Sequence, residues 1–308
     1  MEILVQFLLL ALGFIMLGKG ADWFVEGAAG IAAKFGIPQL VIGLTIVAMG
    51  TSAPEAAVSI AAAMQGSADI TIGNIVGSNI MNILVILGLA AAITPLAVAR
   101  STVRIEMPFM LVITVLLYFL GRDGSVSFGD GLVLAACFGV YMAYLYRVAM
   151  QSNVDADLQE VGLPMSRCLL GAVGGLALII AGSKLTVDAA TALALYAGLS
   201  ERFIGLTIVA LGTSLPELFT SVAAARRGNA DIAIGNIVGS NIFNILFVVG
   251  LSALLVDIPF AKAFNFDTYV AIGAAALLWL CVVRTQRLGR LAGVAMLCCY
   301  AAYLGYIL

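Results

Sequence analysis

The sequence predicts an all-α polytopic membrane protein with ten transmembrane helices, arranged as two inverted five-helix repeats. The first observation is composition: 63% of the 308 residues are hydrophobic and 10% are charged, whereas a globular chain has about 25% charged residues. The second is apolar length, because runs of the roughly 20 residues that cross a bilayer follow one another along the chain, and the mean hydropathy is +1.12. The third is an internal duplication.

The duplicated stretches are residues 43–84 and 205–246, which align without a gap at an offset of 162 and are identical at 31 of 42 positions. Each contains a proline and a carboxylate in an apolar run, GTSAPE in the first copy and GTSLPE in the second. Each continues to a second motif, GNIVGSNIMN or GNIVGSNIFN. The polar residues that recur inside these apolar runs are the candidates for function.

Taken in order, the hydrophobic pattern predicts ten spans near residues 3–32, 38–65, 70–94, 103–120, 128–150, 168–196, 202–227, 232–254, 266–284 and 289–307. The runs do not alternate in polarity, which argues against a membrane β-barrel. The first span begins with an acidic residue, has no small-residue cleavage site and matches the sixth span at the same offset of 162. We therefore interpret it as a permanent helix and not as a signal peptide.

The polar connector 151–165 divides the chain into a first repeat (1–150, with the motif 43–84) and a second repeat (166–308, with the motif 205–246). Its acidic residues lack the glycine and terminal glutamate of an EF-hand loop, so we predict a solvated cytoplasmic linker. The chain has no histidine, which excludes serine–histidine triads and histidine metal sites. Its five cysteines lie in apolar surroundings without a CxxC pair, as core residues do.

The basic residues predict how the spans are oriented. Ten of them fall in one alternating set of loops and three in the other: Lys34, Arg100, Arg104, Arg147, Arg167, Arg226, Arg227, Arg284, Arg287 and Arg290 against Arg122, Arg202 and Lys262. The richer set is expected in the cytoplasm, with both termini outside. Because five spans per half is an odd number, the second half is inserted upside down, a pattern typical of secondary transporters with a site near the midplane.

The prolines predict where the helices open. Pro54 has no N–H, and its ring displaces the carbonyl of Gly50; Pro216 acts in the same way on Gly212. Backbone groups that lack helical hydrogen bonds at membrane depth are tolerated only where they are buried in protein or line a cavity. The neighbouring side chains all offer oxygen, which suits hard cations such as Ca²⁺ and Na⁺. They are Thr51, Ser52, Glu55, Ser78 and Asn82 in the first copy and Thr213, Ser214, Glu217, Ser240 and Asn244 in the second.

Structural roles compete with function at several positions. Hydroxyls in membrane helices often bond a backbone carbonyl, the Gly73/Gly77 and Gly235/Gly239 spacings favour helix packing, and Asn79 and Asn241 can cross-link helices. Glu55 and Glu217 are different, because a charge at the bilayer centre costs about 2.5–3.5 kcal/mol on insertion scales, and packing does not explain two at equivalent positions. For the charged residues of the first and sixth spans we favour ion pairing: Asp22, Glu26, Lys184 and Asp188.

The duplicated GTSAPE/GTSLPE and GNIVGSNIxN motifs resemble the α-repeats of the sodium/calcium exchanger family, the calcium/cation antiporters. The resemblance covers both repeats strongly and implies that the ten polar residues named above are ion ligands, together with the carbonyls of Ala48 and Ala210. It further implies that the first and sixth spans are mobile. Asn244 replaces an aspartate found in some relatives, including the potassium-dependent branch, which argues against potassium coupling. The short connector leaves no room for the calcium-sensing domain of animal exchangers.

We therefore predict an antiporter that exchanges Ca²⁺ for Na⁺ by alternating access, without enzymatic activity or a cofactor. It is expected in a bacterial or archaeal plasma membrane, with the lipid bilayer as its surroundings and no nucleic-acid or protein partner evident. The main alternative is a Ca²⁺/H⁺ or other divalent cation/H⁺ exchanger of the same family. A cation channel is disfavoured, because channels build their rings by oligomeric symmetry. An intramembrane aspartyl protease would need a second aspartate facing Asp130, and none is evident.

Overall fold

A computed structural model describes residues 2–65, 69–151, 163–198 and 210–307. Eight helices in these ranges are long and apolar enough to cross a membrane, and a ninth candidate is the bent pair 39–51 and 53–64. These nine match nine of the predicted spans. The predicted seventh span lies partly on 199–209, outside the described residues, as does most of the predicted connector. The polytopic helical class is confirmed over the described ranges.

The first half runs from α1 (Glu2–Phe35) through a bent span made of α2 (Gln39–Ile42), the π-helical turn η1 (Gly43–Val47), α3 (Ala48–Thr51) and α4 (Ala53–Met64). It continues with α5 (Asp69–Met81), η2 (Asn82–Leu87), α6 (Gly88–Ile93), η3 (Thr102–Glu106), α7 (Met107–Gly121) and α8 (Phe128–Gln151). In the second half the described elements are α9 (Met165–Tyr196), α11 (Ala210–Thr213), α12 (Leu215–Arg226), α13 (Ala230–Phe243), η5 (Asn244–Val249), α14 (Gly250–Leu255), α15 (Phe264–Val282) and α16 (Arg290–Ile307).

Two spans form the centre of the bundle. In α5–η2–α6 and α13–η5–α14, 78% and 83% of the most apolar window is buried, against at most 39% in the other six of the eight long helices. These are the spans that carry the GNIVGSN motifs. The π-helical turns η2 and η5 begin at Asn82 and Asn244, which are equivalent at the offset of 162. A π-helical turn inside an α-helix is often found at a functional site.

Short strand pairs join the two halves, and the sequence did not predict them. Strand β1 (Leu96–Ala97) pairs antiparallel with β4 (Arg287–Leu288), and β2 (Ser125–Val126) pairs antiparallel with β3 (Ile258–Pro259). At the offset of 162, β1 corresponds to β3 and β2 to β4, so the two pairs are equivalent to each other. Two residues per strand are too few for a periodic pattern, which is why the expectation of a purely helical fold missed them.

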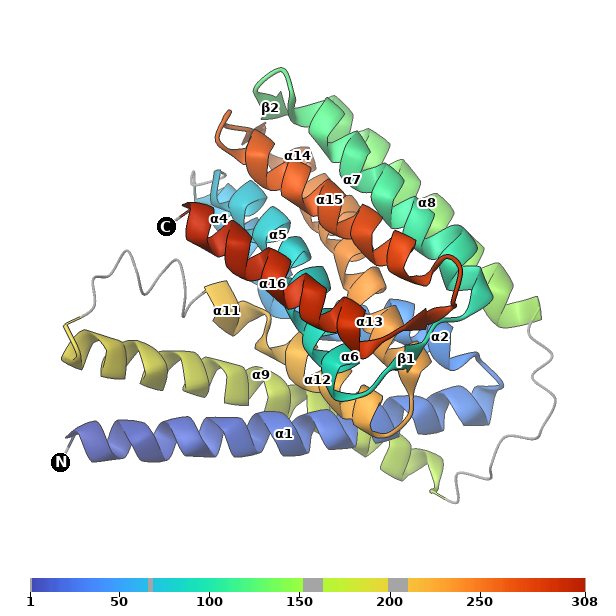
Figure 1. The fold of residues 1–308 in the computed structure, drawn as a ribbon, viewed down its shortest axis with the longest axis vertical. Coiled ribbons are helices and arrows are strands. Elements are labelled where there is room, and N and C mark those ends of the chain that lie inside the picture. The colour runs from blue at the N-terminus through green and yellow to red at the C-terminus, as the bar shows by residue number, and fades with distance from the viewer. Residues whose placement is uncertain (1, 66–68, 152–162, 199–209, 308) are drawn as a thin grey trace.

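Helices α1 and α9 lie side by side along one edge of the molecule (Figure 1). They run antiparallel, because Gly13 faces Gly182 and Gly20 faces Gly175. A Cβ atom at Gly175 would lie 2.5 Å from the backbone nitrogen of Phe24 and 2.7 Å from the carbonyl oxygen of Gly20. Small residues that let two backbones approach this closely are the usual interface of membrane helices.

Replacing Gly175 by alanine should therefore lower the thermal stability of the purified protein, because its methyl group would push α1 away from α9. Overpacking of this kind typically costs about 1–3 kcal/mol. The matched control is Gly174→Ala, since a Cβ there meets nothing within 4 Å, and it should leave stability unchanged or slightly raised. Thermal unfolding of both variants in one detergent is the measurement, and equal midpoints would contradict this account of the interface.

Candidate cation site

The site begins at two equivalent breaks in the helices. Between α3 and α4 the chain leaves helical geometry at Ser52 (φ −80°, ψ 6°), and between α11 and α12 it does so at Ser214 (φ −89°, ψ 3°). In the first copy the flanking segments are bent by 50°. Pro54 and Pro216 stand in the first turn of the following helix, where a missing N–H costs nothing. The predicted opening is confirmed, two residues further along than Gly50 and Gly212.

Each break places a glutamate in the first turn of the next helix. Glu55 lies at the start of α4 and Glu217 at the start of α12, near the positive ends of these helices. Both residues are only 1% exposed. Among the described residues the ion pairs are those of Arg227 with Asp22 and Glu26, so no described basic side chain neutralises the two carboxyl groups.

The two breaks contact each other crosswise. The hydroxyl of Ser52 donates a hydrogen bond of 2.7 Å to Oε1 of Glu217, and the hydroxyl of Ser214 donates one of 3.4 Å to Oε1 of Glu55. The second oxygen of each carboxyl group, Oε2, is buried without a hydrogen-bond partner. Each half thus orients the glutamate of the other half and leaves one of its oxygens free.

Four asparagines add a second, equally symmetric layer. Asn82 donates through Nδ2 to Oδ1 of Asn241 (2.9 Å), and Asn244 donates through Nδ2 to Oδ1 of Asn79 (3.1 Å). Asn79 and Asn241 each donate to the backbone carbonyl of the other, at 3.2 Å in both cases. The expectation that Asn79 and Asn241 cross-link helices agrees with these bonds. These bonds hold the side-chain amides of Asn82 and Asn244 in place and leave the Oδ1 atom of each without a hydrogen-bond partner.

The remaining predicted ligands lie around these groups. Thr51 donates to Oδ1 of Asn236 at 3.0 Å and to the carbonyl of Ala48 at 3.3 Å, and Ser240 donates to the same carbonyl at 3.4 Å. Ser78 is buried, and Thr213 interacts with the carboxyl group of Glu55. Ala210 begins α11 directly after a segment that the structure does not describe. The structure therefore connects ten of the twelve predicted residues through these contacts. Ser78 is placed by its burial and its position one turn before Asn82, and Ala210 is placed only by its position in the chain.

Two further asparagines were missed by the sequence reasoning. Asn74 donates to the hydroxyl of Ser59 at 2.9 Å and to the carbonyl of Glu55 at 3.5 Å. Asn236 repeats this with Ser221 at 2.9 Å and the carbonyl of Glu217 at 3.4 Å. They hold the backbone of each glutamate against the following span. Both are the second residue of the GNIVGSN motif, and their repetition at the same position in both copies is the sequence feature that could have indicated them.

Packing around the site supports the other sequence interpretations in part. A Cβ at Gly239 would lie 2.7 Å from the carbonyl of Leu44, and one at Gly235 would lie 3.0 Å from the Cα of Gly43. The second GxxxG spacing is therefore a close helix contact, as expected. Ion pairing of Asp22 and Glu26 is also found, although their partner is Arg227, beyond the end of α12, and not a residue of α1 or α9.

An apolar helical bundle that buries two glutamates, each with one unpartnered oxygen, beside two unpartnered amide oxygens has the features of a membrane transport protein for cations. The chain belongs to the sodium/calcium exchanger protein family, a family of cation antiporters, whose model matches residues 5–147 and 168–308. The resemblance stated from the motifs is confirmed.

Individual relatives agree over nearly the whole chain. An inner membrane protein of Escherichia coli, YrbG, is 40% identical over 94% of this chain and 92% of its own length. A sodium/calcium exchanger of Methanosarcina acetivorans, MaX1, is 34% identical over 98% of both chains. The solved structure of the sodium–calcium exchanger NCX_Mj covers 99% of this chain and all of its own, with a TM-score of 0.88 and 32% identity.

Proposed function

We propose that the protein is a secondary antiporter that moves Ca²⁺ in one direction and Na⁺ in the other through the site between the two helix breaks. The observation that carries the proposal is the set of four buried, unpartnered oxygens: Oε2 of Glu55 and Glu217 and Oδ1 of Asn82 and Asn244. Leaving such groups unpaired is costly, and a hard cation is the partner that their chemistry suits. The choice of ions is supported by the similarity to MaX1 and NCX_Mj, which are both sodium/calcium exchangers.

The charge of the site sets what it can hold. Two carboxylates neutralise one Ca²⁺, and the same oxygens are suited to Na⁺. Within the described residues no group of three or more Cys, Asp or Glu is close enough to hold a metal, so the site has the modest charge expected where an ion must also leave. The proposed ligands are Ala48, Thr51, Ser52, Glu55, Ser78, Asn82, Ala210, Thr213, Ser214, Glu217, Ser240 and Asn244.

Obligatory exchange follows from the same energetics. A site emptied of cations would keep two buried negative charges, and this state is expensive to carry through a dry pathway. Binding of Ca²⁺ or Na⁺ removes the penalty and permits the change of access. We assign the movement to the α1–α9 pair, which lies along one edge of the molecule and is held together by close glycine contacts.

The proposed architecture is a pair of inverted five-helix repeats, 1–150 and 166–308, joined by the cytoplasmic linker 151–165. Two features support it. Helices α1 and α9, which correspond at the offset of 162, run antiparallel, and the two strand pairs are equivalent at the same offset. Together with the asymmetry of the basic loops, this arrangement supports an orientation with both termini outside a bacterial or archaeal plasma membrane.

Sidedness is tested by labelling single cysteines in a variant without the five native ones. A cysteine at Ser101, before η3, should be protected from an impermeant thiol reagent in intact cells and should react after the cells are opened. One at Ser125, in β2, should react in intact cells. The opposite pattern at both positions would contradict the proposed orientation, and labelling of both positions from the same side would contradict the predicted span between them.

The proposed function is tested by Ca²⁺ uptake into proteoliposomes. Vesicles loaded with Na⁺, K⁺ or buffer alone are diluted into ⁴⁵Ca²⁺ at two external pH values. Uptake that requires an outward Na⁺ gradient supports the proposal. Uptake driven by a proton gradient instead would identify a Ca²⁺/H⁺ exchanger, and uptake that needs no counter-ion gradient would identify a channel.

A further inference from the structure

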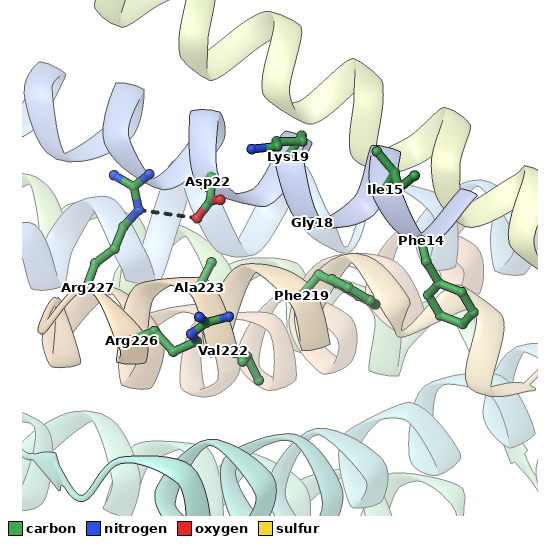
Figure 2. Close-up of a pocket in the computed structure, with 10 residues that line it drawn as sticks. All are labelled: Phe14, Ile15, Gly18, Lys19, Asp22, Phe219, Val222, Ala223, Arg226 and Arg227. Carbon is green, nitrogen blue, oxygen red and sulfur yellow. Dashed lines mark hydrogen bonds and ion pairs between the residues drawn. The ribbon is translucent and has the colours of Figure 1, made fainter. Parts of the chain in front are cut away.

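A second pocket lies away from the cation site, between α1 and α12 (Figure 2). Its volume is about 520 Å³. One end is lined by charged side chains, and the other is lined by Phe14, Ile15, Phe219 and Val222. The rings of Phe14 and Phe219 are 6.1 Å apart at this apolar end, so the pocket is amphiphilic along its length.

The charged end holds more positive groups than it can pair. Arg227 bonds Asp22 at 3.4 Å and Glu26 at 3.2 Å. Lys19 and Arg226 also line the pocket; both are exposed, and no described residue pairs with either side chain. The local balance is three cations against two carboxylates, and the two cations without partners face the same cavity. A bound molecule with a single negative charge would neutralise the charged end of the pocket.

The charged and aromatic residues that line the pocket are not repeated in the other half of the sequence. At the offset of 162, Arg226 and Arg227 correspond to Met64 and Gln65, Phe219 to Ala57, and Lys19 to Ala181. The cation site, in contrast, is repeated almost residue for residue. A feature present in one half only is not part of the duplicated ion machinery, and it has a separate explanation.

The dimensions favour a lipid over a free anion. Residues 14–22 of α1 and 219–227 run in the same direction, because Phe14 packs on Phe219 and Asp22 bonds Arg227. The two contacts are eight residues apart on each helix, which corresponds to about 12 Å along the helix axis. A phosphate group at Lys19 and Arg226 would therefore have its acyl chains at Phe14 and Phe219. Inorganic phosphate would leave the apolar end empty.

We infer that this pocket binds one anionic phospholipid, with its phosphate held by Lys19 and Arg226 and the start of its acyl chains between Phe14 and Phe219. Basic pockets between membrane helices are known to hold anionic headgroups on the cytoplasmic side, which is the side that the basic loops predict for Arg226 and Arg227. The lipid contacts both α1 and α12, so its presence would link the edge helix to the bundle.

The test is native mass spectrometry of the full-length protein in detergent, titrated with phosphatidylglycerol or with phosphatidylcholine of the same acyl chains. The parent should retain one phosphatidylglycerol in preference to phosphatidylcholine. The double variant Lys19→Gln/Arg226→Gln should bind it about 30-fold more weakly, since each basic residue contributes about 1 kcal/mol near a lipid surface. Phe219→Ala should also weaken binding. The charge-conserving variant Lys19→Arg/Arg226→Lys should bind like the parent.

The matched control is Arg147→Gln/Arg284→Gln, which removes two exposed positive charges elsewhere on the predicted cytoplasmic side. It should bind phosphatidylglycerol like the parent, and an equal loss would overturn the pocket in favour of general surface attraction. Equal retention of phosphatidylcholine would overturn the charge selectivity. Displacement of the lipid by millimolar inorganic phosphate, with Phe219→Ala unaffected, would identify a free-anion site instead. Because binding is read without transport, these outcomes are independent of the proposed ion exchange.

Discussion

Replacing Glu55 or Glu217 by glutamine is expected to abolish Na⁺-driven Ca²⁺ uptake while leaving the protein folded. Each variant removes one of the two negative charges that would balance a divalent ion in a site where both residues are 1% exposed. A lost charge at contact distance in so dry a site is worth several kcal/mol, which corresponds to a loss of about 100-fold or more. Initial rates of ⁴⁵Ca²⁺ uptake into Na⁺-loaded proteoliposomes are the measurement.

The structure makes both substitutions conservative apart from charge. Ser52 can still donate to the Oε1 atom of a glutamine at 217, and Ser214 can do so at 55. The matched control is Glu106→Gln, which changes an equally buried carboxyl group on η3 that accepts a hydrogen bond from Tyr144. That bond also survives the substitution. Transport by the control should stay within about threefold of the parent, and near-normal transport by either site variant would remove that glutamate from the ligand set.

Replacing Asn244 by aspartate is expected to make Ca²⁺ transport strongly dependent on pH. The Nδ2 atom of Asn244 donates to Oδ1 of Asn79 at 3.1 Å, and its own Oδ1 is unpartnered. An ionised aspartate at 244 would place a carboxylate oxygen beside Oδ1 of Asn79, and neither of these two acceptors carries a proton to share. It would also add a third negative charge to the site. A protonated aspartate restores the donor and the charge of the parent. The structure therefore favours uptake of a proton over recruitment of an extra cation such as K⁺.

The sign of the effect follows directly. At low pH the variant should transport Ca²⁺ at a rate close to that of the parent, and the rate should fall as the pH rises and the aspartate ionises. Initial rates from about pH 6 to 9, with and without K⁺, are the test. Asn82→Asp should behave in the same way, because Asn82 makes the equivalent bond to Asn241. Asn229→Asp, at the start of α13, is the control and should have a flat profile.

Two results would contradict this account of Asn244. A pH profile like that of the parent would place its oxygen away from the transported ion. A variant that is restored at high pH by K⁺ would show that the site had recruited a cation instead of a proton. In the first case the unpartnered Oδ1 would still need another explanation, because a buried amide oxygen without a donor costs about 1–3 kcal/mol.

The sequence by itself determined the membrane class and the duplication, and it singled out most residues of the candidate site. These features are local. The length of an apolar run shows that a segment crosses the membrane. A proline ring clashes with the carbonyl four residues earlier and so marks a break in the helix. A carboxyl group beside that break indicates function, because burying its charge in the membrane is expensive. The breaks at Ser52 and Ser214 could therefore be anticipated to within two residues, and Glu55 and Glu217 could be singled out without a structure.

Only the tertiary structure decided which atoms meet. The bonds of Asn74 and Asn236 behind the glutamates depend on how each span packs against the preceding one, 15 to 19 residues earlier in the chain. The crosswise bonds from Ser52 to Glu217 and from Ser214 to Glu55 depend on the register between helices about 160 residues apart in the chain. The two strand pairs and the position of Arg227 beside α1 depend on the same register. A sequence pattern shows which face of a helix is buried. It does not show which helix packs against that face, because this depends on close packing throughout the bundle.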